Sequence, residues 1–498
     1  MTRFPTEVDV AIVGSGPAGA TYARVLSEHA PHLRVAVFEA GPLISDPPGT
    51  HVRNIRDAEA RAEAQRRCEG PRPSRPASTD TMDDYARSAN RLQRPGTFLL
   101  DSGWEEFPAA AMSTNVGGMG AHWTGACPRP GESEIIDFLP DLDAWLTEAE
   151  RLLGVSAEAL AGAPLAGEVR RRLAAALDAD RSADRRVRPM PLAVRREPDG
   201  HLRWAGADVV FGGFRDIHPD ALVTRVLLDG DTGNGDTGNG DTGNGDTVSG
   251  VRVRAGGAEH DVRARVVVVA ADSLRTPQVL HASGVRPRAL GRYLNDQPQI
   301  VYAVRLRDIP PSAAHTGISG VSWVPFTDAH PFHGQVMQLD ASPVPFAGEI
   351  VPGSIVGLGW FCAKDLQESD RVAFSDDEVD DYGMPAIRIH YRLTERDLAN
   401  LETAEKEIRQ AAEALGDPLD DQPPLRFPNG ASLHYQGSVR MGQADDGTSV
   451  CGPDSQVWGV RGLYVAGNGV IPTATACNPT LTAVALAVGG ALSIAKEY

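Results

Sequence analysis

The sequence predicts an α/β fold in which a parallel sheet is interleaved with a layer built on an antiparallel sheet. Three observations predict this class. An apolar run at residues 8–13 is followed by a glycine-rich turn, a helix and a second apolar run at residues 34–38, which forms a β-α-β unit. All-apolar strands recur much later, at residues 266–271 and 462–467. Between them, residues 294–392 carry short strand patterns and many turns, which is typical of an antiparallel sheet.

The remaining elements follow from hydrophobic periodicity. A polar stretch rich in Arg and Pro, residues 42–94, is expected to cover the sheet and to contain one helix, at residues 55–67. A helix is also expected after the segment that ends at Pro277. The other expected elements are helices at 20–29, 141–153, 167–177, 404–415 and 480–494, and strands at 248–255, 300–302 and 386–391.

A repeat precedes the strand expected at residues 248–255. Residues 231–245 are three copies of Asp-Thr-Gly-Asn-Gly. Asn-Gly and Asp-Gly are strong hairpin-turn signals, so the repeat is interpreted as an overgrown loop between two paired strands. Carboxylate and amide oxygens are also ligands that calcium prefers, but the period of five residues argues against a calcium site.

Composition restricts the partners. The 498 residues include 48 basic and 66 acidic side chains, for a net charge of −18, which disfavours nucleic acid as a partner. No apolar run reaches the roughly 18 residues that a membrane span needs, and no basic and then apolar leader is seen at the N-terminus. The five cysteines are scattered without a CxxC pair, which disfavours disulfides and zinc. We therefore expect a cytoplasmic protein with no membrane partner and no metal site.

The first β-α-β unit carries a dinucleotide-binding signature. Gly14, Gly16 and Gly19 have the GxGxxG spacing between a strand and a helix. These glycines allow a tight turn, a close approach of the backbone to a pyrophosphate, and close packing of helix on strand. Glu39 lies 20 residues beyond Gly19, where a carboxylate accepts hydrogen bonds from a ribose. This combination predicts a Rossmann-like domain that binds an adenine dinucleotide, either NAD or FAD.

Several further motifs together resemble those of one enzyme family. They are Gly-Ser-Gly-Pro-Ala-Gly at 14–19 with Glu39-Ala40-Gly41, Val-Gly-Gly-Met-Gly-Ala-His-Trp-Thr at 116–124, the strand end Val269-Ala270-Ala271 and Asn-Pro-Thr-Leu-Thr at 478–482. The chain resembles the glucose–methanol–choline (GMC) oxidoreductases, and within them the pyranose oxidase branch, which includes bacterial oxidases acting at C3 of glycosides. Leu433-His434 with Arg440-Met441-Gly442, and the segments 374–376 and 382–385, are also similar.

This resemblance implies FAD as the cofactor and assigns residues to it. A discontinuous FAD-binding domain is expected at residues 1–130, 205–300 and 431–498, with a substrate-binding domain at 131–204 and 301–430. Besides the three glycines and Glu39, the residues that the resemblance assigns to the cofactor are Gly117, Gly118, His122, Thr124, Asn468 and Thr480.

The resemblance also assigns the catalytic groups. Oxidising an alcohol requires a base for the hydroxyl proton, and a histidine is suited to this at neutral pH. Motif matching makes His434 the base and Asn478 its partner, which holds the substrate oxygen through its amide. Asn478 also lies just before a helix, whose positive end favours negative charge on a reduced flavin.

The other site assignments are less specific. In this branch the histidine matching His122 is covalently joined to the flavin in some enzymes, and this bond and a noncovalent contact are both open here. Thr124 is expected near flavin N5. Gln338 and Asp340 lie where the family carries a substrate loop, and their side chains are candidates to bind sugar hydroxyls. Aromatic side chains that stack on a sugar, or that belong to the core, are Trp323, Trp360 and Phe361.

We therefore expect an enzyme that oxidises a secondary ring hydroxyl, C3 or C2, of glucose or of a C- or O-glucoside to a ketone, with O2 or a quinone as the electron acceptor. One alternative is a pyranose 2-oxidase that acts on free sugars. A second is a flavoprotein lyase of the same superfamily without redox turnover. A non-catalytic nucleotide-binding module is the third, and it leaves His434 and Asn478 unexplained.

Overall fold

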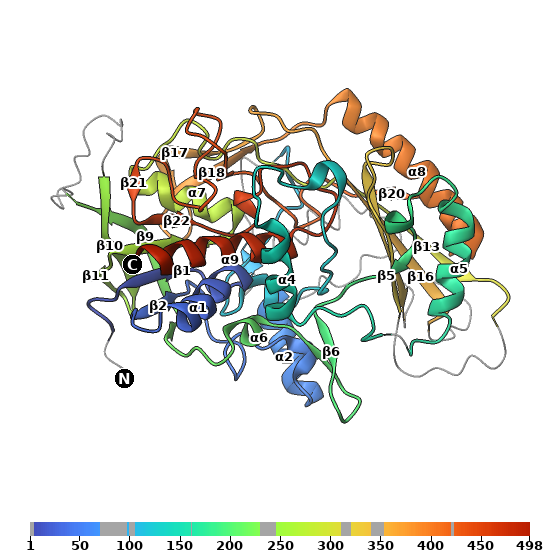
Figure 1. The fold of residues 1–498 in the computed structure, drawn as a ribbon, viewed down its shortest axis with the longest axis horizontal. Coiled ribbons are helices and arrows are strands. Elements are labelled where there is room, and N and C mark those ends of the chain that lie inside the picture. The colour runs from blue at the N-terminus through green and yellow to red at the C-terminus, as the bar shows by residue number, and fades with distance from the viewer. Residues whose placement is uncertain are drawn as a thin grey trace.

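The computed structural model describes residues 4–69, 97–98, 105–160, 162–229, 246–309, 320–339, 353–419 and 423–498. Its two largest sheets lie side by side along the longest axis of the molecule, as Figure 1 shows. Both termini lie at the end that holds the parallel sheet (Figure 1). The α/β class with a parallel and an antiparallel sheet, predicted from the sequence, is thereby confirmed.

The parallel sheet forms the centre of the nucleotide-binding half. Its strand order is β22 (Leu463–Val465), β12 (Val266–Val269), β1 (Val10–Val13), β2 (Val35–Phe38) and β8 (Ile217–His218), and all neighbours are parallel. Every residue of β1, β2, β12 and β22 is buried. These strands are almost wholly Val, Ile, Leu and Ala, because both of their faces are covered.

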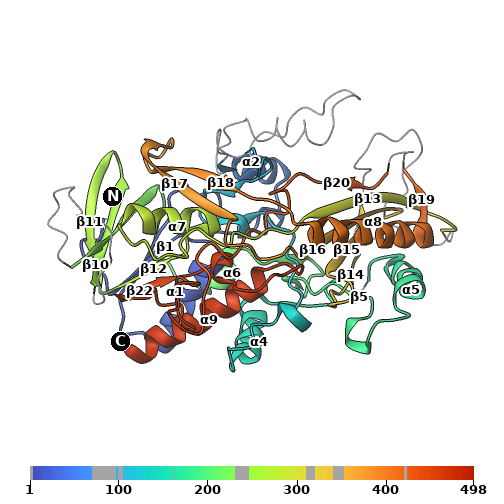
Figure 2. The same cartoon turned by 90° about the horizontal axis from the view of Figure 1, so that it is seen from above.

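Two long helices pack beside this sheet. Helix α1 (Pro17–His29) follows β1, and α9 (Thr480–Glu497) packs against α1 (Figure 2). Among the described residues α9 alone is long and apolar enough to span a membrane, with a mean hydropathy of 1.3. About two thirds of it, 67%, is buried between α1 and α4 (Leu142–Leu153), as expected of a core helix.

A smaller sheet extends the nucleotide-binding half. It contains β9 (Ala221–Leu228), β10 (Asp246–Ala255), β11 (Ala258–Arg263) and the short β21 (Val460–Arg461). The antiparallel pairing of β9 with β10 confirms the hairpin that the repeat predicts. The repeat itself, at 231–245, lies outside the described residues.

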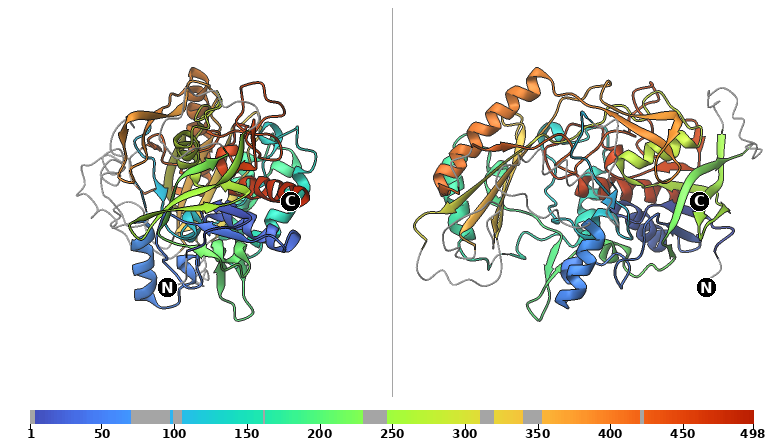
Figure 3. Two further views of the ribbon diagram at one scale, coloured as in Figure 1. Left: turned by 90° about the vertical axis from the view of Figure 1, so that its left-hand side faces the viewer. Right: turned by 180° about the vertical axis from the view of Figure 1, so that it is seen from behind.

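The second large sheet is antiparallel. Its order is β19 (Gly416–Pro418), β13 (Gln299–Leu306), β16 (Ile355–Cys362), β15 (Phe332–Leu339), β14 (Val321–Val324) and β5 (Arg188–Pro189), and β20 (Leu425–Arg426) also pairs with β13. Helices α5 (Ala166–Leu177) and α8 (Glu395–Leu415) cover its outer face, as Figure 3 shows. Its other face is turned toward the nucleotide-binding half (Figure 3).

The remaining elements connect these layers. The proposed boundaries of the two domains stay a prediction. The other described elements are α2 (Ala58–Glu69), α6 (Ala207–Phe211), α7 (Asp272–Ala282) and the hairpins β3–β4 (Thr97–Phe98, Met112–Ser113), β6–β7 (Val194–Arg196, Leu202–Trp204) and β17–β18 (Arg371–Val379, Pro385–His390).

Helices α1 and α2 begin three residues away from their expected starts, at Pro17 and Ala58, and two other helix starts differ by more. Helix α8 begins at Glu395 rather than 404, because Thr394 and Asp397 form a capping box that starts it earlier. Helix α7 begins at Asp272 and contains Pro277 instead of following it. A proline there removes one helical hydrogen bond to the carbonyl four residues earlier. That carbonyl, of Ser273, accepts a hydrogen bond from the Ser438 hydroxyl instead.

Candidate active site

One large cavity gathers most of the motifs that the sequence singles out. Its volume is about 680 Å³, within the range of about 300–1,000 Å³ typical of ligand and cofactor sites. It lies at the carboxyl ends of β1, β2 and β12, where open parallel sheets bind their ligands. Segments far apart in the sequence line it, among them 14–18, 38–40, 111–114, 118–124, 270–273 and 432–435.

The glycine-rich turn has the shape that a pyrophosphate requires. Gly14 has a φ of +102°, and a Cβ there would lie 2.3 Å from the Ala270 carbonyl oxygen. A Cβ on Gly19 would lie 2.1 Å from the Gly14 carbonyl oxygen. Gly16 differs from both, because a Cβ there meets no atom of the chain within 4 Å. Gly16 lines the cavity directly before α1, whose first N–H groups have no partner within the helix.

Glu39 closes the end of β2 beside this turn. Its Oε2 accepts hydrogen bonds from the backbone N–H and the hydroxyl of Ser15, at 3.1 and 2.7 Å, and its Oε1 accepts one from the Gly41 N–H at 2.9 Å. Burial raises the pKa of Glu39, while these hydrogen bonds oppose the rise. The Ser15 hydroxyl in turn accepts a 2.9 Å hydrogen bond from the N–H of Gly117. Glu39 therefore lines the cavity and also stabilises the turn.

Gly117 and Gly118 place the Gly-Gly-Met segment against the glycine-rich turn. A Cβ on Gly118 would lie 3.3 Å from the Gly16 Cα. The cavity is lined by five more of the residues assigned to the cofactor, namely Gly118, His122, Thr124, Asn468 and Thr480. Gly19 and Gly117 are not part of its lining.

His434 and Asn478 meet at the cavity wall, although 44 residues separate them in sequence. The Asn478 Nδ2 lies 3.3 Å from the His434 Nε2. The other imidazole nitrogen, Nδ1, lies 2.7 Å from the Oε1 of Gln297. The structure thus brings together the two residues predicted to be catalytic and adds a third, Gln297. Nothing in the sequence distinguishes Gln297 from Gln299 two residues later.

The His434 imidazole lines the cavity and is partly covered by other side chains. The ring of Phe361, at the end of β16, lies with its centroid 5.3 Å from that of His434. The antiparallel sheet therefore contributes one wall of the site. Burial lowers the pKa of His434 to about 4. A neutral imidazole is consequently the form present at neutral pH, which is the form a general base requires.

A buried carboxyl group orders the segment that carries Asn478. Glu134 accepts hydrogen bonds from the N–H groups of Ala476 and Cys477, at 2.8 and 2.9 Å, and from that of Gly131 at 3.0 Å. Burial raises the pKa of Glu134, and these donors oppose the rise. The sequence analysis missed this residue, because two of its three partners lie more than 340 positions away.

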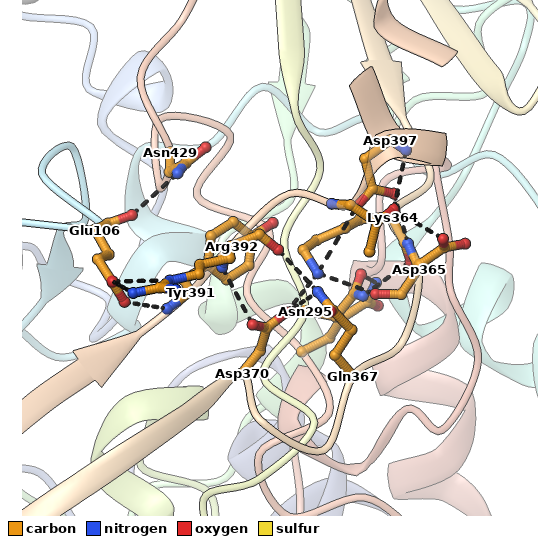
Figure 4. Close-up of polar contacts among 12 residues, drawn as sticks. Glu106, Asn295, Lys364, Asp365, Gln367, Asp370, Tyr391, Arg392, Asp397 and Asn429 are labelled. Atoms are coloured by element: carbon orange, nitrogen blue, oxygen red, sulfur yellow. Dashed lines mark hydrogen bonds and ion pairs between the residues drawn. The ribbon is translucent and has the colours of Figure 1, made fainter. Parts of the chain in front are cut away.

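A polar cluster, drawn in Figure 4, includes Asn295, whose backbone pairs with that of Gln436 two residues beyond His434. Lys364 is fully buried and pairs with Asp370, and its Nζ lies 4.0 Å from Asp397. The Lys364 carbonyl accepts a 3.1 Å hydrogen bond from the side chain of Asn295, and the Asn295 backbone pairs with Gln436 in both directions at 2.9 Å. Buried charges are costly unless they are paired, so the ion pair with Asp370 keeps Lys364 in one position. The Lys364 carbonyl in turn holds the side chain of Asn295.

His122 lies on the opposite wall. Its Nε2 is 2.7 Å from the Ser113 hydroxyl. Its neighbour Trp123 donates a 2.7 Å hydrogen bond from its indole N–H to the Ala205 carbonyl. Thr124 is exposed to the cavity.

Gln338, one of the two predicted substrate ligands, does not line the cavity. Gln338 is buried, and its amide contacts the carbonyls of Pro164 and Gly353 and the N–H of Gly320. These backbone partners engage the amide of Gln338, and its predicted role in binding substrate stays a prediction. Asp340 lies outside the described residues. Trp360 is fully buried in the core, and Trp323 donates its indole N–H to His333 at 3.0 Å.

The site suits a flavin dinucleotide. The chain leaves room beside Gly16, and the Asn478 Oδ1 is buried without a hydrogen-bond partner among the described residues. No group of three His, Cys, Asp or Glu side chains that could hold a metal ion is found in the part of the chain that the structure describes.

Family models match three parts of the chain. The GMC oxidoreductase models match residues 215–299 and 369–487, and a model for an NAD(P)-binding Rossmann-like domain matches residues 12–67.

Similar proteins extend over the full length. The chain is 59% identical to a C-glycoside 3-oxidase of Microbacterium trichothecenolyticum, over 99% of this chain and 98% of that protein. It is 56% identical to a C-glycoside 3-oxidase of Arthrobacter globiformis, over 100% and 96%. A pyranose 2-oxidase of Tricholoma matsutake is 30% identical over 98% and 93%.

Among solved structures, a formate oxidase superposes with a TM-score of 0.67 at 15% identity, over 100% of this chain and 99% of that one. A pyridoxine 4-oxidase from "Mesorbium loti" gives 0.62 at 18% identity, over 98% and 99%. At these identities the two structures support the fold alone. The matched models and the full-length relatives show that the chain is a flavin-binding member of the GMC oxidoreductase family.

Proposed function

We propose that the protein oxidises the secondary hydroxyl at C3 of the sugar ring in a C- or O-glucoside to a ketone. The observation that carries the reaction class is the neutral His434 imidazole, with its Nε2 at the wall of the cofactor cavity and 3.3 Å from the Asn478 amide. The choice of C3 and of a glycoside rests on the two C-glycoside 3-oxidases that share 59% and 56% identity with the chain.

His434 and Asn478 act on one hydroxyl group. The Nε2 lone pair of His434 accepts the hydroxyl proton, and the Asn478 side chain holds the same oxygen in place. FAD, when bound, supplies the acceptor for the two electrons and the hydrogen that leave the carbinol carbon as a hydride. Phe361 keeps water from the far side of the imidazole, and burial keeps that ring uncharged before the reaction.

Replacing His434 by alanine tests this role. A general base contributes roughly 10²- to 10⁴-fold to a rate, so H434A should retain its yellow flavin but lose most of its anaerobic bleaching by substrate. Rapid bleaching of H434A would reject His434 as the base. The variant F374L changes a half-buried ring outside the cavity lining and serves as a control for handling and flavin content.

Product analysis decides between the substrate alternatives. A glycoside 3-oxidase should convert a C-glucoside to the 3-keto product, whereas a pyranose 2-oxidase should prefer free glucose and yield the 2-keto sugar. Equal or better activity on free glucose with oxidation at C2 would overturn the proposal. A lyase would leave the flavin oxidised when substrate is added without oxygen.

We further propose that FAD is bound without a covalent bond to His122. The Ser113 hydroxyl lies 2.7 Å from the Nε2 of His122, and this contact supports a histidine that packs beside the flavin without a covalent bond. Acid precipitation should therefore release yellow flavin into the supernatant. Flavin that remains with the denatured pellet would reject this part of the proposal.

Two properties of the enzyme in the cell complete the proposal. Both bacterial relatives are named oxidases, which favours O2 over a quinone as the electron acceptor. All five cysteines lie in the described residues, where they are buried and form no disulfide, which suits a reducing cytoplasm. Peroxide formation measured against quinone reduction tests the acceptor, and fractionation of the producing cells tests the location.

A further inference from the structure

Gln297 occupies a position that determines which nitrogen of His434 carries the proton. The backbone pairing of Asn295 with Gln436 is antiparallel, so Gln297 lies directly opposite His434 two residues further along. Gln297 is almost completely buried, at 1% exposure. Its Oε1 lies 2.7 Å from the His434 Nδ1.

The orientation of the Gln297 amide follows from its other contacts. Its Nε2 donates hydrogen bonds to the carbonyl oxygens of Thr475 and Cys477, at 2.9 and 2.8 Å. A carbonyl only accepts hydrogen bonds, so the amide nitrogen must face these two groups. The amide oxygen therefore faces His434. Reversing the amide would set an oxygen against two carbonyl oxygens and an NH2 group against the imidazole.

A fixed acceptor at Nδ1 selects one form of the neutral imidazole. Neutral histidine carries its proton on one nitrogen and a lone pair on the other. The Gln297 Oε1 requires an N–H at Nδ1, so the lone pair lies on Nε2. This agrees with the Asn478 NH2 group, which lies 3.3 Å from Nε2 and donates toward it.

We propose that Gln297 is a positioning residue that holds His434 in the tautomer with the proton on Nδ1, and so keeps the Nε2 lone pair directed at the substrate hydroxyl. This inference rests on the proposed base role of His434. Gln297 contacts neither the substrate nor the reacting atoms, and it does not line the cavity. The same amide also holds the Thr475–Cys477 segment, so it sets the positions of His434 and Asn478 together.

Substituting methionine for Gln297 tests the proposal. Q297M keeps the length of the side chain but removes the acceptor, so the Nε2–H form becomes accessible and blocks the base. The rate of anaerobic flavin reduction should fall at least about 10-fold, and by no more than about the 10⁴-fold cost of a base held in the wrong tautomer. Flavin content and the substrate dissociation constant should stay within about twofold of the native values. Q297E, whose protonated carboxyl group can donate to one of these carbonyls and present its other oxygen to Nδ1, should recover much of the lost rate.

Gln436 offers a matched control. It is equally buried, at 0% exposure, and its amide bonds to Thr475 and Asn295 in the same two segments without touching His434. Q436M should therefore lower the melting temperature about as much as Q297M, while flavin reduction stays within about threefold of the native rate. Equal losses of rate in Q297M and Q436M would overturn the proposal and leave Gln297 a purely structural residue.

A spectroscopic measurement does not depend on turnover. In the native holoenzyme labelled with ¹⁵N-histidine, the His434 signals, identified by their absence in H434A, should show a protonated Nδ1 and an unprotonated Nε2 at pH 7. The opposite pattern in the native protein would reject the proposal even if Q297M fails to fold. If H434A keeps its rate of flavin bleaching, the proposed base role fails instead, and this outcome is separate from the result for Gln297.

Discussion

Alanine at Gly16 separates binding of the cofactor from folding of the glycine-rich turn. A Cβ on Gly16 meets no atom of the chain within 4 Å and points to open space beside the cavity. The φ of Gly16 is −63°, which any residue adopts. G16A should therefore fold with a change in stability of no more than about 0.5 kcal/mol, as expected of a substitution without a clash.

The cost of G16A should appear in FAD affinity. The added methyl group occupies the space through which a pyrophosphate approaches the first turn of α1. Loss of one hydrogen bond between a backbone N–H and a phosphate is worth about 1.5–3 kcal/mol. Since about 1.4 kcal/mol is tenfold in affinity, FAD should bind roughly 10- to 100-fold more weakly.

The assay is a titration of apoprotein with FAD, followed by the quenching of flavin fluorescence, together with thermal melts of the apoprotein. Gly19 provides the contrasting variant, because a Cβ there lies 2.1 Å from the Gly14 carbonyl oxygen. G19A should lose about 1–3 kcal/mol of stability in the apoprotein itself. A G16A protein that binds FAD within twofold of the native affinity would refute the assignment of this turn to the pyrophosphate.

Three further predictions follow from the site and from α8. The base must be neutral, and burial lowers the pKa of His434 to about 4. The rate of flavin reduction should therefore be independent of pH above about pH 5 and should fall as the pH drops through 4. Stopped-flow measurements in which the rate already declines near pH 6.5 would contradict this. E134Q sets an NH2 group against one of the three N–H donors that face Glu134. It should lower the free energy of unfolding, measured with denaturant, by about 1–3 kcal/mol and slow flavin reduction by displacing Asn478. An unchanged reduction rate would show that Glu134 does not position Asn478. T394A removes the hydroxyl that caps α8 by accepting a hydrogen bond from the Asp397 N–H. It should lower the free energy of unfolding by about 0.5–2 kcal/mol and leave the rate of flavin reduction unchanged. A stability equal to that of the native protein would reject the capping role.

The elements that the sequence predicted well are those in which local pattern and tertiary environment agree. The strands β1, β2 and β12 are continuous apolar runs because both of their faces are buried, so composition alone locates them. Helix α8 was predicted too short at its N-terminus, because its first turn is polar and its start depends on the capping box at Thr394.

The same distinction applies to the site. Gly14, Gly16 and Gly19 are recognisable because a pyrophosphate requires particular backbone shapes at a fixed spacing along the chain. The predicted substrate role of Gln338 gains no support from the structure and stays a prediction. Its position in the sequence suggested a substrate loop, but three backbone groups from other segments occupy its amide.

The sequence by itself predicted the nucleotide-binding turn, the parallel strands and the pair His434 and Asn478 that we propose to react, because each depends on residues that lie close together or on a motif matched as a unit. Only the tertiary structure decided the environment of that pair. Gln297, Glu134 and Phe361 reach His434 and Asn478 through contacts between segments that are distant in sequence. The charge and tautomer of an imidazole depend on burial and on the partner of each nitrogen, and these are properties of the folded chain.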